Sequence, residues 1–226
     1  MTTHVALLGH PVAHSLSPRM QNAAFAARAL DWRYSAFDVE DPVEAVRALR
    51  TLGFAGANVT IPHKQAVVPA CDEADGDAVN TLVFRDGRVL GFNTDRDILA
   101  GIHAERACVI GGGGAALAIG PGLPADVRIF TRSGAWPPDA TGCDLIVNAT
   151  PVRDELLVEP HAGQTVVELA YAADGGDTAL VAAARAAGCE VIDGREALVR
   201  QGARSFELWT GVPAPVDVMR AAVRAA

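Results

Sequence analysis

The chain has 226 residues, of which half are hydrophobic and a fifth are charged, and its formal net charge is −8. This composition is typical of a folded globular protein and argues against disorder. The negative charge and the scattered basic residues exclude the clustered basic surface that a nucleic-acid partner requires. No apolar run approaches the roughly 20 residues of a membrane span, and a strand-like segment begins at Val5 with no signal peptide before it. We therefore expect a cytoplasmic protein without a membrane partner.

The four cysteines are too widely spaced to suggest a metal site. Cys71, Cys108, Cys143 and Cys189 contain no Cys-x-x-Cys pair, and the histidines have no ligand spacing either. We interpret the cysteines as reduced packing residues and expect no bound metal.

Strand and helix patterns alternate through the first hundred residues, which predicts an α/β fold. Strands are expected at 5–8, 34–39 and 58–62, and helices at 20–30, 42–52 and 64–70. Ser17 is predicted to cap the first helix, with Pro18 at its first helical position. A hairpin is expected at 81–85 and 89–92, where Asp86 and Gly87 form the turn.

A second α/β segment follows a short helical stretch at 97–104. Its predicted elements are strands at 107–110, 127–131, 145–148, 166–169 and 190–192, with an alanine-rich helix at 178–187. The change of character near residue 100 predicts a boundary between two α/β domains. Composition and periodicity leave open which domain carries the segments 198–208 and 216–225.

The stretch from Gly56 to Lys64 combines a short strand with a polar face. Asn58 and Thr60 are two positions apart and so lie on one face of the strand, and Pro62 ends its hydrogen-bond ladder just before Lys64. An edge strand with a solvated face is the alternative interpretation. We favour a functional site because the pair Asn-Thr occurs again at 80–81 and at 93–94, where Asp95 follows it.

A strand that runs into four glycines and then a helix is typical of a Rossmann dinucleotide site, in which backbone N–H groups face a pyrophosphate. Gly111 and Gly113 fit the pattern G-x-G-x-x-G/A, with Ala116 in the third position. A glycine turn that serves only chain reversal remains the alternative.

The next predicted strand ends at Thr131, Arg132 and Ser133. An NAD site usually carries an acidic residue at this distance from the glycines, whereas a guanidinium suits a 2′-phosphate. The sequence therefore favours NADP as the cofactor, with an arginine that is merely exposed after a strand as the alternative.

Together these segments resemble the shikimate dehydrogenase family over most of the chain. Residues 9–18 are similar to its serine motif, 56–64 to its lysine motif, and 78–81 and 93–95 to its two asparagine motifs. The resemblance implies an N-terminal α/β substrate domain plus a Rossmann-like dinucleotide-binding domain, with a cleft between them. The expected boundaries are 1–100 with 203–226 for the substrate domain, including the C-terminal helix, and 101–202 for the nucleotide domain.

By the same resemblance, the expected reaction is NADPH-dependent reduction of 3-dehydroshikimate to shikimate, on the route to chorismate and the aromatic amino acids. The implied catalytic residues are Lys64 as acid and base and Asp95 as its partner. The implied substrate contacts are Ser15, Ser17, Asn58, Thr60, Asn80, Tyr171 and Gln201. The implied cofactor contacts are Gly111, Gly112, Gly113, Gly114, Ala115, Thr131, Arg132, Ser133, Leu169 and Gly194.

The chain departs from the family pattern mainly in its second half. Arg96 and Leu117 replace a usual glycine and a common arginine, and residues 133–144 are too few for the helix and strand that the family places there. The nucleotide domain is thus shortened, and we expect weakened cofactor binding. The alternatives are a quinate or aminoshikimate dehydrogenase of the same family, or a non-catalytic substrate-binding homologue. The sequence is compatible with a monomer or a homodimer.

Overall fold

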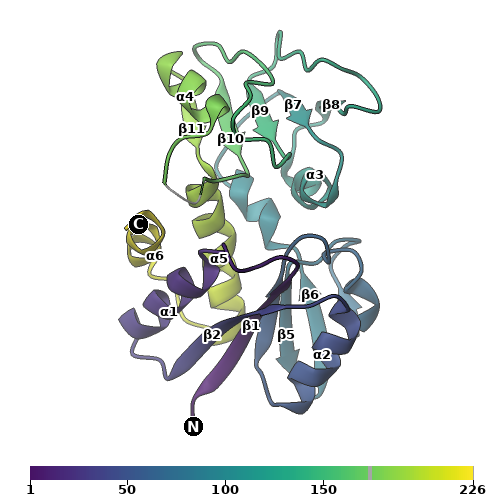
Figure 1. Cartoon of the computed structure of the whole chain (residues 1–226), viewed down its shortest axis with the longest axis vertical. Coiled ribbons are helices and arrows are strands. Elements are labelled where there is room, and N and C mark those ends of the chain that lie inside the picture. The colour runs from purple at the N-terminus through teal and green to yellow at the C-terminus, as the bar shows by residue number, and fades with distance from the viewer. Residues whose placement is uncertain (173–174, 226) are drawn as a thin grey trace. The chain divides into compact units, whose positions relative to one another are not determined.

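The computed structural model describes residues 1–172 and 175–225, which form two compact units (Figure 1). The first comprises Met1–Asp95 and Val199–Ala225, and the second comprises Arg96–Leu198. Among the described residues, no helix combines the length and apolarity needed to cross a membrane.

The first unit is built around a six-stranded sheet in the order β2-β1-β3-β5-β6-β4. Strand β1 pairs in parallel with β2 and β3, whereas β3–β5 and β5–β6 are antiparallel. The elements of this unit are β1 (Thr3–Gly9), α1 (Ser17–Ala27), β2 (Trp32–Asp38), α2 (Pro42–Thr51), β3 (Gly56–Val59), the 3-10 helix η1 (Val68–Ala70), β4 (Glu73–Ala74), β5 (Thr81–Arg85), β6 (Arg88–Phe92), the C-terminal part of α5 (Gly194–Thr210) and α6 (Val216–Arg224).

Helices cover both faces of this sheet, with α1, α5 and α6 on one side and α2 on the other (Figure 1). On the α2 side, Val46 and Leu49 pack in a buried cluster with Ala6 and Leu8 of β1. On the opposite side, Phe25 of α1 stacks on Phe206 of α5 with ring centroids 5.4 Å apart. Successive side chains of β1 point to opposite faces of the sheet, so β1 contributes buried residues to the packing on both sides.

The second unit contains a five-stranded parallel sheet in the order β11-β10-β9-β7-β8. Its elements are β7 (Arg106–Ile110), α3 (Gly114–Ile119), the 3-10 helix η3 (Gly120–Gly122), β8 (Asp126–Phe130), β9 (Leu145–Asn148), β10 (Thr165–Glu168), α4 (Ala179–Ala186), β11 (Glu190–Ile192) and the start of α5. The 3-10 helix η2 (Thr94–Leu99) leads into this unit from the first.

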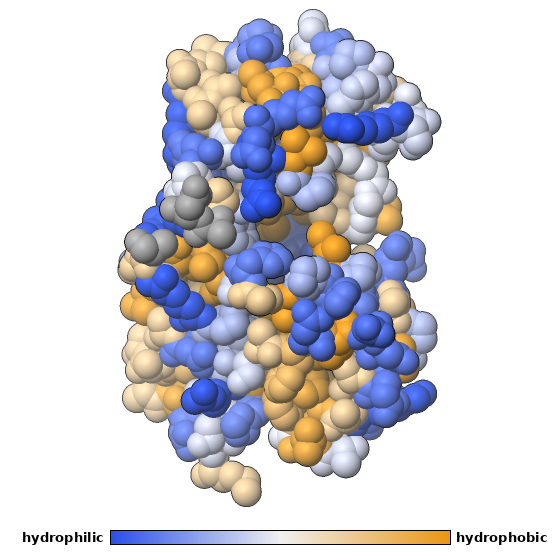
Figure 2. Space-filling model, viewed as in Figure 1, coloured by the Kyte–Doolittle hydropathy of each residue, from blue (hydrophilic) through white to orange (hydrophobic). Residues whose placement is uncertain are grey.

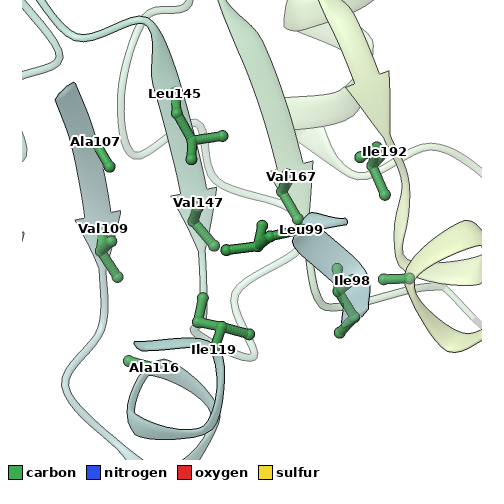
Figure 3. Packing of buried hydrophobic residues seen from close by; sticks show 11 residues of the cluster. Ile98, Leu99, Ala107, Val109, Ala116, Ile119, Leu145, Val147, Val167 and Ile192 are labelled. Carbon is green, nitrogen blue, oxygen red and sulfur yellow. The ribbon is translucent and has the colours of Figure 1, made fainter. Parts of the chain in front are cut away.

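The core of the second unit forms because its central strands are apolar on both faces, as parallel sheets require. All four residues of β9 are buried. Figure 3 shows Leu99 of η2 between Val147 and Val167 on one face, with Ile119 of α3 next to them. The short segment after the Asn-Thr-Asp motif thus contributes core side chains to the shortened unit.

The predicted strands agree with the structure to within about two residues at most ends, whereas four local predictions are wrong. The helical stretch expected at 97–104 is the 3-10 helix η2, which ends at Leu99. The first helix begins at Ser17 with Leu16 in the capping position, so Ser17 is not the cap. The strand predicted to reach Pro62 ends at Val59. The helix expected at 64–70 is only η1, because Pro69 within it has no N–H to donate.

Two other features match their predictions in detail. The hairpin turn has positive φ at Asp86 (52°) and Gly87 (76°), as a two-residue β-turn of this kind requires. Residues 131–144 contain neither helix nor strand, so β8 is left at the edge of the second sheet. On the face drawn in Figure 2, hydrophobic and hydrophilic residues are interspersed over each unit.

We predict that Gly56→Ala destabilises the protein through overpacking of β3. A Cβ at Gly56 would lie 2.2 Å from the Leu82 carbonyl oxygen and 2.5 Å from Trp209 Nε1, which itself donates to that carbonyl. We expect the free energy of unfolding in urea to fall by about 2–3 kcal/mol. The matched control is Gly76→Ala, where a Cβ meets nothing within 4 Å and we expect a change below about 0.5 kcal/mol. Equal stability of the two variants would contradict the packing argument.

Candidate active site

The direction of the strands brings polar segments of the first unit to one edge of its sheet. Because β5 runs antiparallel to β3, the start of β5 lies beside the end of β3, and the end of β6 returns to the same place. Asn80 precedes β5, whereas Asn93, Thr94 and Asp95 follow β6. Lys64 is fixed at this edge by its backbone, since its carbonyl accepts the Val79 N–H at 2.8 Å.

The central contact of this edge is an ion pair between Lys64 and Asp95. The Lys64 Nζ donates to Asp95 Oδ2 at 2.5 Å, and the two side chains are only 13% and 9% exposed. The other carboxylate oxygen, Oδ1, accepts from Asn80 Nδ2 at 2.7 Å. The structure thus brings together Lys64, Asn80 and Asp95, from three segments separated in sequence.

Asn80 fixes Asp95 from two sides. Besides the bond from its Nδ2, its Oδ1 accepts from the Thr94 N–H at 2.8 Å and from the Thr94 hydroxyl at 3.1 Å. The Asp95 N–H in turn donates to Asn93 Oδ1 at 3.1 Å. These bonds hold the carboxylate in one position, so that the ammonium meets a preorganised partner.

Asn58 lies in a buried network next to this pair. Its Oδ1 accepts from the Tyr34 hydroxyl at 2.8 Å, and its Nδ2 donates to the Asn80 carbonyl at 3.1 Å and to Ser205 Oγ at 2.9 Å. Asn58 is 6% exposed, and its amide groups are already engaged within the protein.

The sequence reasoning missed Ser205, a fully buried residue of α5. Its hydroxyl lies 2.8 Å from Thr81 Oγ1 and 3.3 Å from Thr94 Oγ1. A serine within a helix carries no local signal of such a role, because its partners lie more than a hundred positions away in the sequence.

The two serines of the N-terminal motif lie at the start of α1. Ser15 Oγ accepts the Ser17 N–H at 3.2 Å, whereas Leu16 holds the cap position without a side-chain bond, so the predicted cap by the Ser17 hydroxyl is not formed. The physical reason is that Ser17 already has helical geometry, so its own hydroxyl is not placed to cap the N–H groups that follow. Thr60, at the end of β3, is half-buried, with its Cγ2 against Gly9, where a Cβ would be 2.4 Å away.

The remaining predicted substrate contacts fall in different units. Gln201 belongs to the first unit, where its carbonyl accepts from Ser205 Oγ at 3.1 Å. Tyr171 belongs to the second unit, in the loop after β10, where its carbonyl accepts from Arg153 at 3.2 Å.

The glycine turn of the second unit has the form that a pyrophosphate needs. Gly111 has φ +108°, and a Cβ there would lie 3.1 Å from the Ala149 carbonyl oxygen. Gly112 and Gly113 are exposed, and among the described residues neither N–H donates to a protein acceptor. A Cβ at Gly113 or Gly114 would meet nothing within 4 Å, so the turn is open, and Ala115 follows it in the first turn of α3. Free N–H groups beside open space fit the phosphates of a dinucleotide.

The segment after β8 lies directly beside this turn. A Cβ at Gly112 would be 2.9 Å from Thr131 Cγ2, and the Thr131 and Ser133 hydroxyls lie 3.5 Å apart. Arg132 is 70% exposed, with its guanidinium carbon 5.5 Å from the centre of the Trp136 ring. The arginine is therefore accessible next to the glycines, as the sequence argument requires.

Leu169 and Gly194 lie on the loop after β10 and at the start of α5. Leu169 packs against the core cluster of the second unit, and its N–H donates to the Asn148 carbonyl at 3.1 Å. A Cβ at Gly194 would be 2.1 Å from the Ala170 carbonyl oxygen, so only glycine permits this approach.

A buried carboxylate supports the same loop and was also missed by sequence reasoning. Glu168 is fully buried and accepts from Asn148 Nδ2, from the Ala170 N–H and from the Thr178 hydroxyl at 2.9–3.1 Å. Burial raises the pKa of Glu168 to about 7, because these neutral donors only partly offset the loss of water.

Comparison with known proteins agrees with these arrangements. Residues 7–82 match the shikimate dehydrogenase substrate binding domain, and residues 194–224 match the shikimate 5′-dehydrogenase C-terminal domain. A shikimate dehydrogenase (NADP(+)) of Moorella thermoacetica is 38% identical, with 98% of this chain and 92% of the relative covered. The chain belongs to the shikimate dehydrogenase family.

Further members of the family give the same result. The shikimate dehydrogenase (NADP(+)) of Methanopyrus kandleri is 38% identical, with 98% of this chain and 95% of the relative covered. The crystal structure of the Thermus thermophilus shikimate 5-dehydrogenase in complex with NADP(H) and shikimate has a TM-score of 0.84 at 30% identity, with 99% of each chain covered. The alignment with the Moorella relative spans 275 positions, more than the length of this chain, so the chain lacks internal segments that the relative has.

We predict that Glu168 makes the stability of the protein depend on pH. Its folded pKa of about 7 lies above the ordinary value of 4.5, so the folded protein binds an extra proton between these values. The stabilising contribution of this group is then fully present below about pH 4.5 and is lost as the pH rises through about 7, by roughly 3 kcal/mol. The Glu168→Gln variant lacks this contribution. Urea unfolding of both proteins at pH 5 and pH 8 measures how the free energy of unfolding of each changes with pH. An equal pH dependence in the two proteins would rule out Glu168 as its source.

Proposed function

We propose that the protein is an NADP-dependent shikimate dehydrogenase that reduces 3-dehydroshikimate to shikimate. The observation that carries the proposal is the contact between Lys64 and Asp95 at the edge of the first sheet. A module that only bound a ligand would have no need to hold an ammonium against a nearly buried carboxylate. The named functions of the relatives, their full-length coverage and the open glycine turn support the same proposal.

The chemistry follows from the groups at this edge. Bound NADPH supplies the hydride. Reduction places negative charge on the carbonyl oxygen, and the Lys64 ammonium stabilises that charge and donates the proton. Asp95 holds the ammonium in position and accepts a hydrogen bond from a substrate hydroxyl. In the reverse direction Lys64 accepts the hydroxyl proton.

The substrate contacts are proposed by resemblance to the family, and Asn80 is included although it is buried and its amide also bonds to Thr94 and Asp95. Ser15 and Ser17 are assigned to the substrate carboxylate, and Thr60, Asn80, Tyr171 and Gln201 to the remaining polar groups. Asn58 is given a different role, because its amide already bonds to Tyr34, Asn80 and Ser205. We assign it, with Ser205, to positioning the segments that carry Asn80 and Asp95.

The second unit is proposed to hold the dinucleotide. The turn at 111–115 holds the pyrophosphate through the N–H groups of Gly112 and Gly113, because the Gly111 N–H already donates to the Phe130 carbonyl, and Thr131, Arg132 and Ser133 bind the 2′-phosphate. Leu169 and Gly194 are assigned to the nicotinamide end. The domain limits proposed for this function are 1–100 with 203–226 and 101–202, which differ by a few residues from the compact units Met1–Asp95 with Val199–Ala225 and Arg96–Leu198.

Two wider features belong to the same proposal. All four cysteines are free thiols, which suits a reducing compartment and supports a cytoplasmic location. The enzyme is proposed to act as a monomer or a homodimer. Quinate and amino analogues of shikimate would use the same lysine and serines, so a substrate panel belongs in the assay.

Lys64→Ala is expected to lower kcat for shikimate oxidation with NADP by about 10²–10⁴-fold, because the acid–base group is removed. Lys64→Arg keeps the positive charge but holds its proton too tightly to exchange it, and is expected to lose activity similarly. The matched control is Arg47→Ala, which removes a largely exposed cation paired with Glu44 and should leave kcat unchanged. Steady-state kinetics and circular dichroism measure activity and folding. Undiminished turnover in folded Lys64→Ala would remove the catalytic assignment.

Lys64 is the single lysine among the 226 residues. Protein labelled with [ζ-15N]lysine therefore gives one side-chain ammonium signal in NMR. We expect this signal to shift on addition of shikimate, because the substrate hydroxyl approaches the ammonium, and to remain unchanged on addition of benzoate as a carboxylate control. A lysine signal unaffected by saturating shikimate would contradict the proposed contact.

A further inference from the structure

The accessible arginine of the second unit has two close neighbours that the reaction does not require. One is the ring of Trp136, with its centre 5.5 Å from the Arg132 guanidinium carbon. The other is the Glu155 carboxylate, with Oε2 3.7 Å from Arg132 Nη2. Arg132 therefore contacts both an aromatic face and a negative charge.

Trp136 is brought to this place by a tight turn. The Gly134 N–H donates to the Thr131 carbonyl at 3.0 Å, and the Thr131 N–H donates to the Ala135 carbonyl at 3.1 Å. These bonds fold residue 136 back beside residue 132. Trp136 remains 39% exposed, so part of a large aromatic surface faces solvent beside Arg132.

The two neighbours have opposite effects on a nucleotide. An aromatic face stacks on a base, and it holds a guanidinium by a cation–π contact while leaving the N–H groups of the arginine free for a phosphate. A carboxylate beside the same guanidinium competes with a 2′-phosphate and repels it. Both Arg132 and Glu155 are mainly exposed, at 70% and 65%, so their ion pair is weak and can be displaced.

We propose that Trp136 and Glu155 tune cofactor choice in this chain, with Trp136 as the stacking surface for the adenine and the brace of Arg132, and Glu155 as a competitor that limits the preference for NADP over NAD. The inference rests on the proposed function, because it presupposes that Arg132 meets the 2′-phosphate. It assigns part of the recognition of the cofactor to the shortened segment 131–144. This segment carries Trp136 and contains a turn but no helix or strand.

The test is equilibrium binding by calorimetry, with NADP, NAD and adenosine 2′,5′-bisphosphate as probes. The bisphosphate carries the adenine and the 2′-phosphate without the nicotinamide, so its binding does not depend on turnover. Glu155→Gln is expected to tighten NADP and the bisphosphate by about two- to fivefold and to leave NAD unchanged. Trp136→Ala is expected to weaken all three by at least about fivefold, and Trp136→Phe much less.

Glu159→Gln is the matched control, because it removes an exposed carboxylate close to Glu155 in the sequence. Glu159 has no ion pair with Arg132 among the described residues. If Glu155→Gln and Glu159→Gln change NADP affinity equally, or if Glu155→Gln changes NAD as much as NADP, the role of Glu155 is wrong. If folded Trp136→Ala binds all probes like the wild type, the role of Trp136 is wrong. These results leave the proposed function intact, provided that the wild type oxidises shikimate with NADP. A wild type that binds none of the probes overturns the inference and the proposed function together.

Discussion

The ion pair of Lys64 and Asp95 depends on a reversal of strand direction and on one amide. In an all-parallel sheet, the segments before β5 and after β6 would lie at opposite edges. The antiparallel pairing of β3, β5 and β6 instead brings both beside the end of β3. Asn80 then joins them, because its backbone bonds to Val59 and Phe92 while its side chain holds Thr94 and Asp95. The contact between Lys64 and Asp95 thus depends on the pairing of the strands.

The second unit shows how little a nucleotide-binding sheet needs in order to fold. Residues 131–144 contain no regular structure, yet β7, which pairs with β8, and β9 beyond it keep both faces buried. One face packs with Leu99, Ile119 and Val167, and the other packs with Phe130 and Leu180. Shortening therefore affects the edge of the sheet, where β8 has only one partner, and leaves the centre intact. Arg132 follows β8 at this edge, so the shortened segment includes the arginine that we propose for the 2′-phosphate.

The sequence predicted those parts of the structure that depend on near neighbours. Apolar runs such as 145–148 predicted strands, Asp86 and Gly87 predicted a turn, and recognisable motifs pointed to Lys64 and Asp95. The failures have a different cause. Whether Ser17 caps its helix depends on where the chain becomes helical, within a residue or two. The roles of Ser205, Glu168 and Glu155 depend on partners from distant segments, and neither residue type nor spacing reports such contacts.

Asp95 and Glu168 are both carboxylates with little exposed surface, but the groups that surround them differ. Asp95 has an ammonium at 2.5 Å as well as the Asn80 amide, so its negative charge has a direct counter-charge. Glu168 has comparable burial but only neutral donors, from Asn148, Ala170 and Thr178, and burial raises its pKa to about 7. A hydrogen-bond donor replaces water only in part, whereas a cation also opposes the cost of burying charge. Asp95 therefore lies beside the one lysine of the chain, whereas Glu168, which ties a loop, has neutral donors.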